Sequence, residues 1–212
     1  LVRFDVPNKR IDLVSLPRDT LLHNEYRNNK LNFAYAKGGT ELLMEQIENL
    51  LGIPVDFYVT VNLKGFIALV DQIDGVDFDI PINMDYDDPY QDLHIHFTKG
   101  PRHLNGQEAM EVVRSANNDG TGYGTEDIGR IGTQQAFLKA VAKQLLQIGN
   151  VKNIPALVDI FYTYVKTDLT TGNLVWLGNE ALNIGTENIH FATLPGDGSG
   201  YYNKQSVYVL DA

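Results

Sequence analysis

The segment Asp127-Ile128-Gly129-Arg130-Ile131-Gly132-Thr133-Gln134-Gln135 begins the longest amphipathic helix that the sequence predicts, which continues to about Leu146. At about 100° per residue, the aliphatic positions on one face of this helix are Ile131, Leu138, Val141 and Leu145. Asp127, Arg130 and Gln134 fall on the same face, in its first turns. Because an unpaired charge costs several kcal/mol to bury, these turns are expected to face a polar pocket rather than a dry core.

The start of this helix also offers a place for an anion. The free N–H groups of its first turn and the positive end of its dipole both point outward from the N-terminus. Arg130 carries the guanidinium that suits phosphate, so the sequence predicts a phosphate site here. The alternative is an Asp127–Arg130 pair that caps the helix at the rim of the core.

The composition excludes several classes of protein. With 212 residues, 43% of them hydrophobic, the chain predicts one domain with a substantial core, and no segment resembles a transmembrane helix or a signal peptide. The net charge of −10 argues against nucleic acid as a partner. The absence of cysteine excludes thiol chemistry. Because Leu1-Val2-Arg3-Phe4 is already strand-like, we expect an excised domain whose membrane anchor lies outside this chain.

Two strands are predicted at the start of the chain, over Val2–Val6 and Arg10–Leu16. The second is apolar on both faces apart from two positions, which indicates a central strand. It ends in Pro17-Arg18-Asp19-Thr20. In open α/β sheets ligands bind beyond the carboxyl ends of strands, so Arg18 and Asp19 stand where a site is expected. The alternative is an ordinary polar turn.

The remaining pattern predicts a single α/β domain. Helices are expected from the N-cap Thr40 to Leu51, over Leu63–Ile73, from Asn105 to about Arg114, and over Ile154–Val165 and Leu174–Leu182. Strands are expected over Asp56–Asn62, Val76–Ile80, Asp92–Phe97, Ile189–Leu194 and Val207–Leu210. The strand–helix–strand order from Asp56 to Ile80 predicts a βαβ unit, and Met84–Tyr90 is expected to be an acidic loop.

His94 and His96 alternate along one predicted strand and share one face. Two such imidazoles are able to hold a metal, but no third ligand stands at a convincing spacing. Two ordinary strand histidines are therefore the favoured interpretation.

Four motifs occur in order along the chain. They are Leu13-Val14-Ser15-Leu16-Pro17-Arg18-Asp19-Thr20; Lys30-Leu31-Asn32-Phe33-Ala34-Tyr35; Leu104-Asn105-Gly106-Gln107-Glu108-Ala109 followed by Arg114; and Asp127-x-Gly-Arg130-x-x-x-Gln134. Through these motifs nearly the whole chain resembles the LytR–CpsA–Psr family of bacterial cell-wall enzymes.

The resemblance implies an α-β-α sandwich with a central mixed β-sheet flanked by helices, spanning residues 1–212 as one catalytic domain. It implies a phosphotransferase at the extracytoplasmic face of the cell membrane, on a single-pass anchor. Such enzymes move a glycopolymer, such as wall teichoic acid or capsule, from undecaprenyl pyrophosphate to a peptidoglycan sugar hydroxyl. The implied cofactor is Mg²⁺, with Mn²⁺ as a substitute.

The resemblance also assigns roles to individual residues. Those expected to contact the pyrophosphate are Arg18, Lys30, Arg114, Arg130 and Gln134. Asp19 and Asp127 are the expected Mg²⁺ ligands, and one of them is expected to accept the proton of the attacking hydroxyl. The residues expected to take part in catalysis are Arg18, Asp19, Arg114, Asp127 and Arg130. Gln134 is expected to bind a phosphate oxygen or to hold Arg130 in place.

Three departures from the family pattern leave other functions open. Ala116 and Thr133 stand where relatives carry further arginines, and the family strand with a Ser-Asp pair that precedes the first motif is missing. The alternatives are a non-catalytic binder of polyprenyl-phosphate lipids or wall glycans, and a lipid pyrophosphatase that uses water as acceptor.

Overall fold

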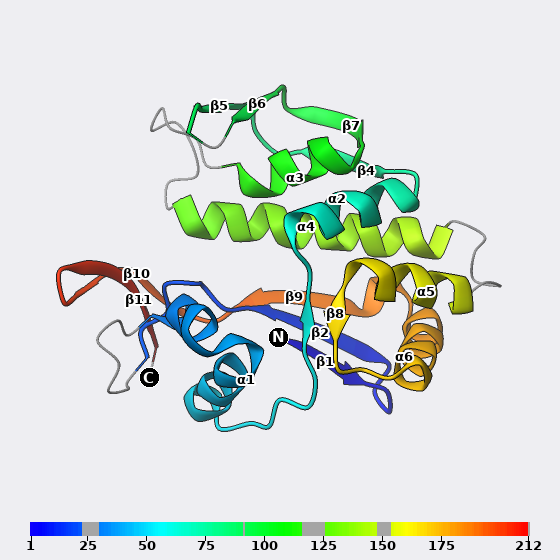
Figure 1. The fold of residues 1–212 in the computed structure, drawn as a ribbon, viewed down its shortest axis with the longest axis horizontal. Coiled ribbons are helices and arrows are strands. Elements are labelled where there is room, and N and C mark those ends of the chain that lie inside the picture. The colour runs from blue at the N-terminus through cyan, green and yellow to red at the C-terminus, as the bar shows by residue number, and fades with distance from the viewer. Residues whose placement is uncertain (23–29, 91, 116–125, 148–153, 212) are drawn as a thin grey trace. The chain divides into compact units, whose positions relative to one another are not determined.

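The computed structural model describes residues 1–22, 30–90, 92–115, 126–147 and 154–211 (Figure 1). The chain folds into two compact units, and each is described by itself. Unit 1 comprises Leu1–Arg3, Asp12–Tyr58 and Phe191–Ala212, and unit 2 comprises Phe4–Ile11 and Val59–His190. No helix in the described ranges is both long enough and apolar enough to cross a membrane.

Helices and strands alternate irregularly along the chain. In order they are β1 (Val2–Asp5), β2 (Arg10–Ser15), α1 (Leu31–Leu51), β3 (Val59–Thr60), α2 (Leu63–Gln72), β4 (Val76–Ile80), β5 (Met84–Asp88), β6 (Leu93–Phe97), β7 (Gly100–Leu104), α3 (Gly106–Arg114), α4 (Glu126–Gln147), α5 (Ile154–Tyr164), β8 (Lys166–Thr167), α6 (Thr171–Ile184), η2 (Thr186–Asn188), β9 (Ile189–Thr193), β10 (Gly196–Tyr202) and β11 (Gln205–Leu210).

The predicted central strand is confirmed. Strands β1, β2 and β9 form a three-stranded sheet in that order, with β2 in the middle. In unit 1, the N–H of Val14 donates to the carbonyl of Leu1 at 2.8 Å, and the N–H of Leu194 donates to that of Ser15 at 3.0 Å. The end of β2 is therefore hydrogen-bonded on both sides, immediately before the predicted site residues Arg18 and Asp19.

Helix α1 begins earlier than predicted and is kinked. The expected break at Lys37-Gly38-Gly39 is a single non-helical residue, Gly39, with φ 66° and ψ −153°. The helical segment that continues to Leu51 thus starts directly after Gly39, within one residue of the predicted N-cap Thr40, whereas the helical segment from Leu31 to this break was not predicted. The helix ends where expected, at the left-handed Gly52. Its apolar residues pack with Leu16 and Leu22 to form the core of unit 1.

Unit 2 is organised around Phe137 of α4, which is 1% exposed. Its ring lies 5.6 Å from that of Phe78 in an edge-on arrangement and 5.7 Å from that of Phe66. Around it, α2, α3 and α4 pack together beside the β4–β7 and β5–β6 strand pairs, as Figure 1 shows. Removing a phenylalanine from such a position costs about 3–5 kcal/mol, so this contact is central to the stability of the unit.

The predicted βαβ unit is wrong. The first predicted strand of this unit, Asp56–Asn62, is reduced in the structure to the two residues of β3, which pairs antiparallel with β8. Strand β4 pairs antiparallel with β7. The helix between β3 and β4, α2, is confirmed. The hydrophobic pattern specified a strand at Val76–Ile80 but carried no information on its partner, because alternation is the same in parallel and antiparallel pairs.

The predicted acidic loop Met84–Tyr90 is also wrong, since Met84–Asp88 forms β5 and pairs antiparallel with β6. Met84 is 1% exposed, and the aspartates at alternate positions point outward. Because the segment is rich in aspartate, its alternation of apolar and acidic residues was not recognised as an amphipathic strand. Strand β10 was missed as well, because its glycines mask the pattern.

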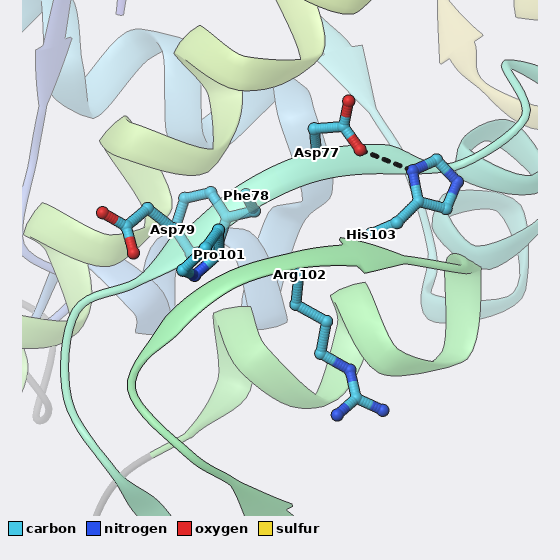
Figure 2. Close-up of a pocket in the computed structure, with 6 residues that line it drawn as sticks. All are labelled: Asp77, Phe78, Asp79, Pro101, Arg102 and His103. Carbon is cyan, nitrogen blue, oxygen red and sulfur yellow. Dashed lines mark hydrogen bonds and ion pairs between the residues drawn. The ribbon is translucent and has the colours of Figure 1, made fainter.

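Two polar residues face each other across β4 and β7. Asp77 is the register partner of His103, and its Oδ1 lies 2.7 Å from the imidazole Nδ1 (Figure 2). This hydrogen bond raises the pKa of His103 above its ordinary value, although the partial loss of solvent opposes the shift.

We predict that Gly106→Ala destabilises the protein by roughly 2–4 kcal/mol. A Cβ at Gly106 would overlap the main-chain carbonyl of Ile67, where α3 approaches α2 closely. Gly172→Ala is the matched control, because its Cβ would meet nothing nearer than 3.8 Å. Urea unfolding measures both, and equal effects of the two substitutions would contradict the close approach of the helices.

We predict that His103→Asn lowers the melting temperature at about pH 5.5 by about 1–2 °C more than at about pH 9. A raised pKa in the folded state stabilises the protein fully below the ordinary histidine pKa, and this stabilisation is lost as the pH rises through the raised pKa. The exposed His190 of β9, changed to Asn, is the control. A difference that grows toward alkaline pH would show that the sign is wrong.

Candidate functional site

Main-chain hydrogen bonds hold the segment after β2 between two distant parts of unit 1. The carbonyl of Asp19 accepts from the N–H of Tyr208 in β11 at 2.8 Å. The carbonyl of Arg18 accepts from the N–H of Asn32 in α1 at 2.9 Å. Thr20 is fully buried, and its hydroxyl donates to the carbonyl of Pro17 at 2.6 Å. The backbone at Arg18 and Asp19 is therefore fixed, which a site with demanding geometry requires.

The Asp19 carboxylate gathers three side chains around one of its oxygens. Oδ1 lies 3.3 Å from Nζ of Lys30, 3.4 Å from Nδ2 of Asn32 and 3.8 Å from Nε of Arg18. We call these four residues the Arg18 cluster. With two cations and one carboxylate, it carries a net positive charge in an acidic protein, which favours an anionic ligand.

The cations of the Arg18 cluster differ in exposure. The side chain of Lys30 is only 16% exposed, so it mainly serves to hold Asp19. The side chain of Arg18 is 65% exposed, so its guanidinium is accessible to a ligand. The sequence predicted Arg18, Asp19 and Lys30 as site residues. Asn32 was missed as a site residue, although it lies in the quoted motif two positions after Lys30.

A second set of predicted residues lies in unit 2, on α3 and α4. Arg114 is in the last turn of α3, where a cation is favoured by the helix dipole. The amide of Gln134 in α4 donates to the carbonyl of Val113 at 3.1 Å, next to Arg114. Arg130 lies one turn before Gln134 on α4, at a spacing that makes the two side chains neighbours. We call Arg114, Arg130 and Gln134 the Arg114 cluster.

This geometry gives Gln134 a specific role. Its amide ties α4 to the end of α3, so it positions the backbone that carries Arg114. This contact uses only the side-chain N–H of Gln134, so its predicted role in binding a phosphate oxygen or holding Arg130 stays a prediction.

The predicted apolar face of α4 is confirmed at Val141 and Leu145, which pack against the core, and is wrong at Leu138. Leu138 is 44% exposed, whereas Phe137 and Thr133 are buried. Arg130 stands seven residues before Phe137 and therefore on the same face of the helix. The prediction that this face changes from charged to apolar along the helix thus holds for Arg130.

The structure accounts for one departure from the family pattern. Thr133 is 4% exposed, and its hydroxyl donates to the carbonyl of Gly129 at 3.3 Å. Position 133 therefore faces the interior and presents no cation. Ser115, directly after Arg114, is 1% exposed, and its Oγ has no hydrogen-bond partner in the parts of the chain that the structure describes.

Other predicted features lie outside the described residues. They are Ala116 and the side chain of Asp127, so neither the Asp127–Arg130 pair nor Mg²⁺ ligation by Asp127 is tested. The Arg18 cluster belongs to unit 1 and the Arg114 cluster to unit 2, and each is known within its own unit.

A separate hollow of about 370 Å³ lies over β4 and β7 (Figure 2). Its lining residues are Asp77, Phe78, Asp79, Pro101, Arg102 and His103. None of the predicted site residues is among them, and its guanidinium, that of Arg102, is paired with Glu108 at 2.6 Å. We therefore place the candidate phosphate-binding residues in the two clusters, one in each unit, and not at this hollow.

Comparison with known proteins agrees with the motifs. A model of the LytR_cpsA_psr family matches residues 1–212. The chain is 33% identical over 174 residues to TagV of Bacillus subtilis (strain 168), named polyisoprenyl-teichoic acid–peptidoglycan teichoic acid transferase, covering 80% of this chain and 44% of TagV. It is 32% identical over 200 residues to a TagU transferase of Bacillus cereus, named for the same reaction, covering 93% of this chain and 62% of that protein. The chain thus spans about half the length of these relatives.

The fold is that of solved relatives. The crystal structure of B. subtilis TagV superimposes with a TM-score of 0.81 at 29% identity, covering 99% of this chain and 80% of the solved chain. The predicted fold class, helices around a mixed β-sheet, is confirmed by this likeness and by the elements observed.

We predict that Asp19 and Lys30 are energetically coupled. Removing either partner leaves the other charge largely buried, so Lys30→Met and Asp19→Asn are each expected to cost about 1–3 kcal/mol in the free energy of unfolding. The double variant is expected to cost at least about 1 kcal/mol less than the sum. Urea unfolding of all four proteins measures the coupling, and strict additivity would refute it.

Proposed function

Because the chain belongs to the LytR–CpsA–Psr family, we propose that it is the catalytic part of a glycopolymer–peptidoglycan phosphotransferase. The donor is a glycan, such as teichoic acid, on a polyprenyl-pyrophosphate carrier, and the acceptor is a sugar hydroxyl of peptidoglycan. The proposal places the domain at the outer face of the cell membrane, held by an anchor elsewhere in the protein. The observation that carries it is the rigidly held Arg18 cluster, an anion site at the end of a central strand in a chain whose relatives bear this activity in their names.

The reaction demands charge stabilisation more than covalent catalysis. The acceptor oxygen bonds to the phosphorus that carries the glycan, the bond from this phosphorus to the bridging oxygen breaks, and the lipid leaves as polyprenyl monophosphate. Negative charge grows on the leaving phosphate. In this scheme the exposed guanidinium of Arg18 binds the pyrophosphate and neutralises that charge, with Arg114 and Arg130 as the further guanidinium groups.

A carboxylate must receive the proton of the acceptor hydroxyl. In the Arg18 cluster, all three nitrogen contacts of Asp19 use Oδ1, and none of the three involves Oδ2. We propose that Asp19 acts through Oδ2, either as the acceptor of this proton or as a ligand of the metal ion. Lys30 and Asn32 hold the carboxylate in one orientation, so they act as positioning residues.

The residues fit the Mg²⁺ that the family implies. One carboxylate with an uncommitted oxygen, beside cations that hold phosphate, suits Mg²⁺, which takes few carboxylates and completes its shell with water and substrate phosphate. Asp19 is the proposed ligand, with Asp127 as the second. When bound, the ion would neutralise charge on the pyrophosphate; Mn²⁺ is expected to substitute.

A non-catalytic binder of lipid-linked glycans is the second candidate. The observation that favours it is the burial of Thr133, which leaves the site without a guanidinium at this position. A binder would retain Arg18 and Lys30 for the pyrophosphate and would not need a proton acceptor.

We predict that the chain releases polyprenyl phosphate from a polyprenyl-pyrophosphate glycan with Mg²⁺, and that release depends on added peptidoglycan. Arg18→Ala and Arg130→Ala are each expected to lower the rate by about 10²-fold or more, because each removes a charge-assisted contact from the transition state. Chelation with EDTA is expected to abolish release until Mg²⁺ is restored. The exposed Arg3 of β1, changed to Ala, is the matched control.

The outcomes separate the candidates. Acceptor-dependent release that falls in both variants supports the transferase. Release that is equally fast without peptidoglycan identifies a lipid pyrophosphatase. Tight binding of the lipid without release identifies a binder and overturns the enzyme.

A further inference from the structure

The hairpin of β5 and β6 carries a group of polar side chains that belongs to neither the Arg18 cluster nor the Arg114 cluster. The two strands pair antiparallel, with Asp85 opposite His96 and Asp87 opposite His94. Leu93, Ile95 and Phe97 alternate with the histidines and are buried in the core of unit 2. The four polar side chains therefore share the outer face of a hairpin whose inner face is firmly packed.

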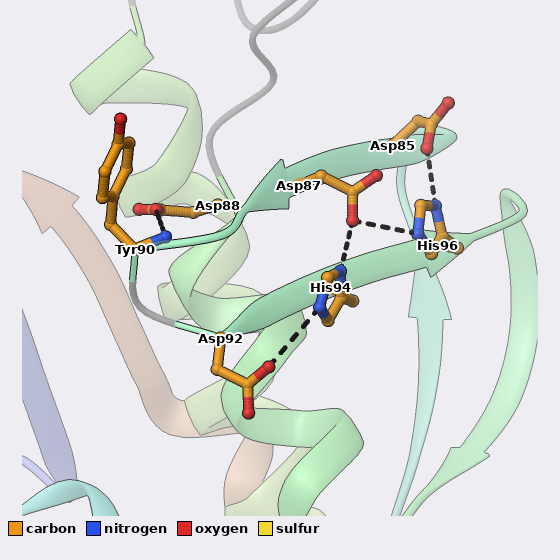
Figure 3. Close-up of polar contacts among 7 residues, drawn as sticks. All are labelled: Asp85, Asp87, Asp88, Tyr90, Asp92, His94 and His96. Carbon is orange, nitrogen blue, oxygen red and sulfur yellow. Dashed lines mark hydrogen bonds and ion pairs between the residues drawn. The ribbon is translucent and has the colours of Figure 1, made fainter.

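One carboxylate oxygen lies between the two imidazoles, as Figure 3 shows. Oδ1 of Asp87 is 2.5 Å from Nδ1 of His94 and 3.5 Å from Nε2 of His96. The ligand atoms that Asp87, His94 and His96 offer all lie within 4.8 Å of one another. Ligands of one tetrahedral ion at about 2.0–2.1 Å are roughly 3.3 Å apart, so only small side-chain rotations separate this arrangement from a coordinated one.

The other nitrogen of each imidazole already has a carboxylate partner. Nδ1 of His96 lies 2.6 Å from Oδ1 of Asp85, and Nε2 of His94 lies 3.6 Å from Oδ1 of Asp92. Metal-binding histidines regularly donate their second N–H to a carboxylate, which fixes the ring and makes the ligating nitrogen more basic. His96 has such a hydrogen-bond partner in Asp85, Asp92 lies at ion-pair distance from His94, and in each case the remaining nitrogen is the one that faces Asp87. The carboxylate beside the second nitrogen of each imidazole distinguishes this arrangement from an ordinary cluster of acidic residues.

We propose that Asp87, His94 and His96 form a surface site for a divalent transition metal of the Zn²⁺ type, with Asp85 and Asp92 orienting the two rings. Two imidazoles and one carboxylate suit Zn²⁺, Cu²⁺ or Ni²⁺ better than Mg²⁺, which prefers oxygen ligands only. The carboxylates around the site add negative charge that a divalent cation neutralises. The proposal does not depend on the proposed transferase activity.

The site would be open on one side. The side chains of Asp87, His94 and His96 are 54%, 58% and 56% exposed, so the remaining coordination positions face solvent. An ion there links β5 to β6 by ligands on both strands. The consequence is a hairpin whose stability depends on the metal.

We predict one Zn²⁺ per chain, measured by titration of residues 1–212, without a polyhistidine tag, against a chromophoric chelator. His94→Ala and His96→Ala are each expected to weaken binding at least about 100-fold, and Asp85→Asn about 10-fold because it only orients a ring. His190→Ala, an exposed histidine of β9, is the matched control and is expected to bind as wild type does. Zn²⁺ is also expected to raise the melting temperature of wild type and not of His94→Ala.

Spectroscopy of the Cu²⁺ complex and a limit on the affinity complete the test. With Cu²⁺, electron paramagnetic resonance is expected to show two nitrogen ligands in wild type and one in His96→Ala, while circular dichroism verifies that the variants are folded. The proposal is overturned if Zn²⁺ binds no more tightly than about 1 mM, a level of chance surface binding. It is equally overturned if the histidine variants bind as wild type does or if Mg²⁺ competes on equal terms, since the pairs would then be plain ion pairs.

Discussion

Unit 1 depends on the hydrogen bonding of a short stretch of main chain, from Arg18 to Leu21. Carbonyl groups in this stretch accept from α1 on one side and from β11 on the other, and the N–H of Leu21 returns to the carbonyl of Tyr208 at 2.8 Å. Buried main-chain groups must be paired, so these bonds are structural requirements first. Their consequence is functional, because the only exposed side chain among these residues that is suited to phosphate, Arg18, extends from a backbone that is hydrogen-bonded on both sides.

This arrangement explains why an acidic protein offers a cationic site. The net charge of −10 sets the average field of the molecule, yet a local site is decided by neighbours within a few ångströms. Asp19 does not cancel the positive charge of the cluster, because Oδ1 of this one carboxylate lies near both the mostly buried Lys30 and the exposed Arg18. A single carboxylate thereby organises two cations and keeps one oxygen for chemistry.

The sequence predicted features that depend on neighbouring residues and failed on those that depend on distant partners. The capping box of Asn105 and Glu108 starts α3 as expected, since both hydrogen bonds are local. The βαβ unit failed because the partner of β4 is β7, and no local pattern names a strand's partner. In the same way the motif residues Arg18, Asp19 and Lys30 were recognised, whereas the support of Asp19 by Tyr208 was invisible across the length of the chain.

The hairpin of β5 and β6 shows how the wrong assignment of a strand to a loop led to a ligand set being missed. The sequence placed His94 and His96 on one face of a strand, but no third ligand stood at a convincing spacing, because Asp87 was assigned to an acidic loop. Met84 and Tyr86 alternate with Asp85 and Asp87 in the same period of two that placed the histidines on one face. Treating the acidic segment as an amphipathic strand would have set the aspartates opposite the histidines, because antiparallel register follows from the short turn between the strands. Ligand sets that lie across a strand pair are thus best sought by register rather than by spacing along the chain.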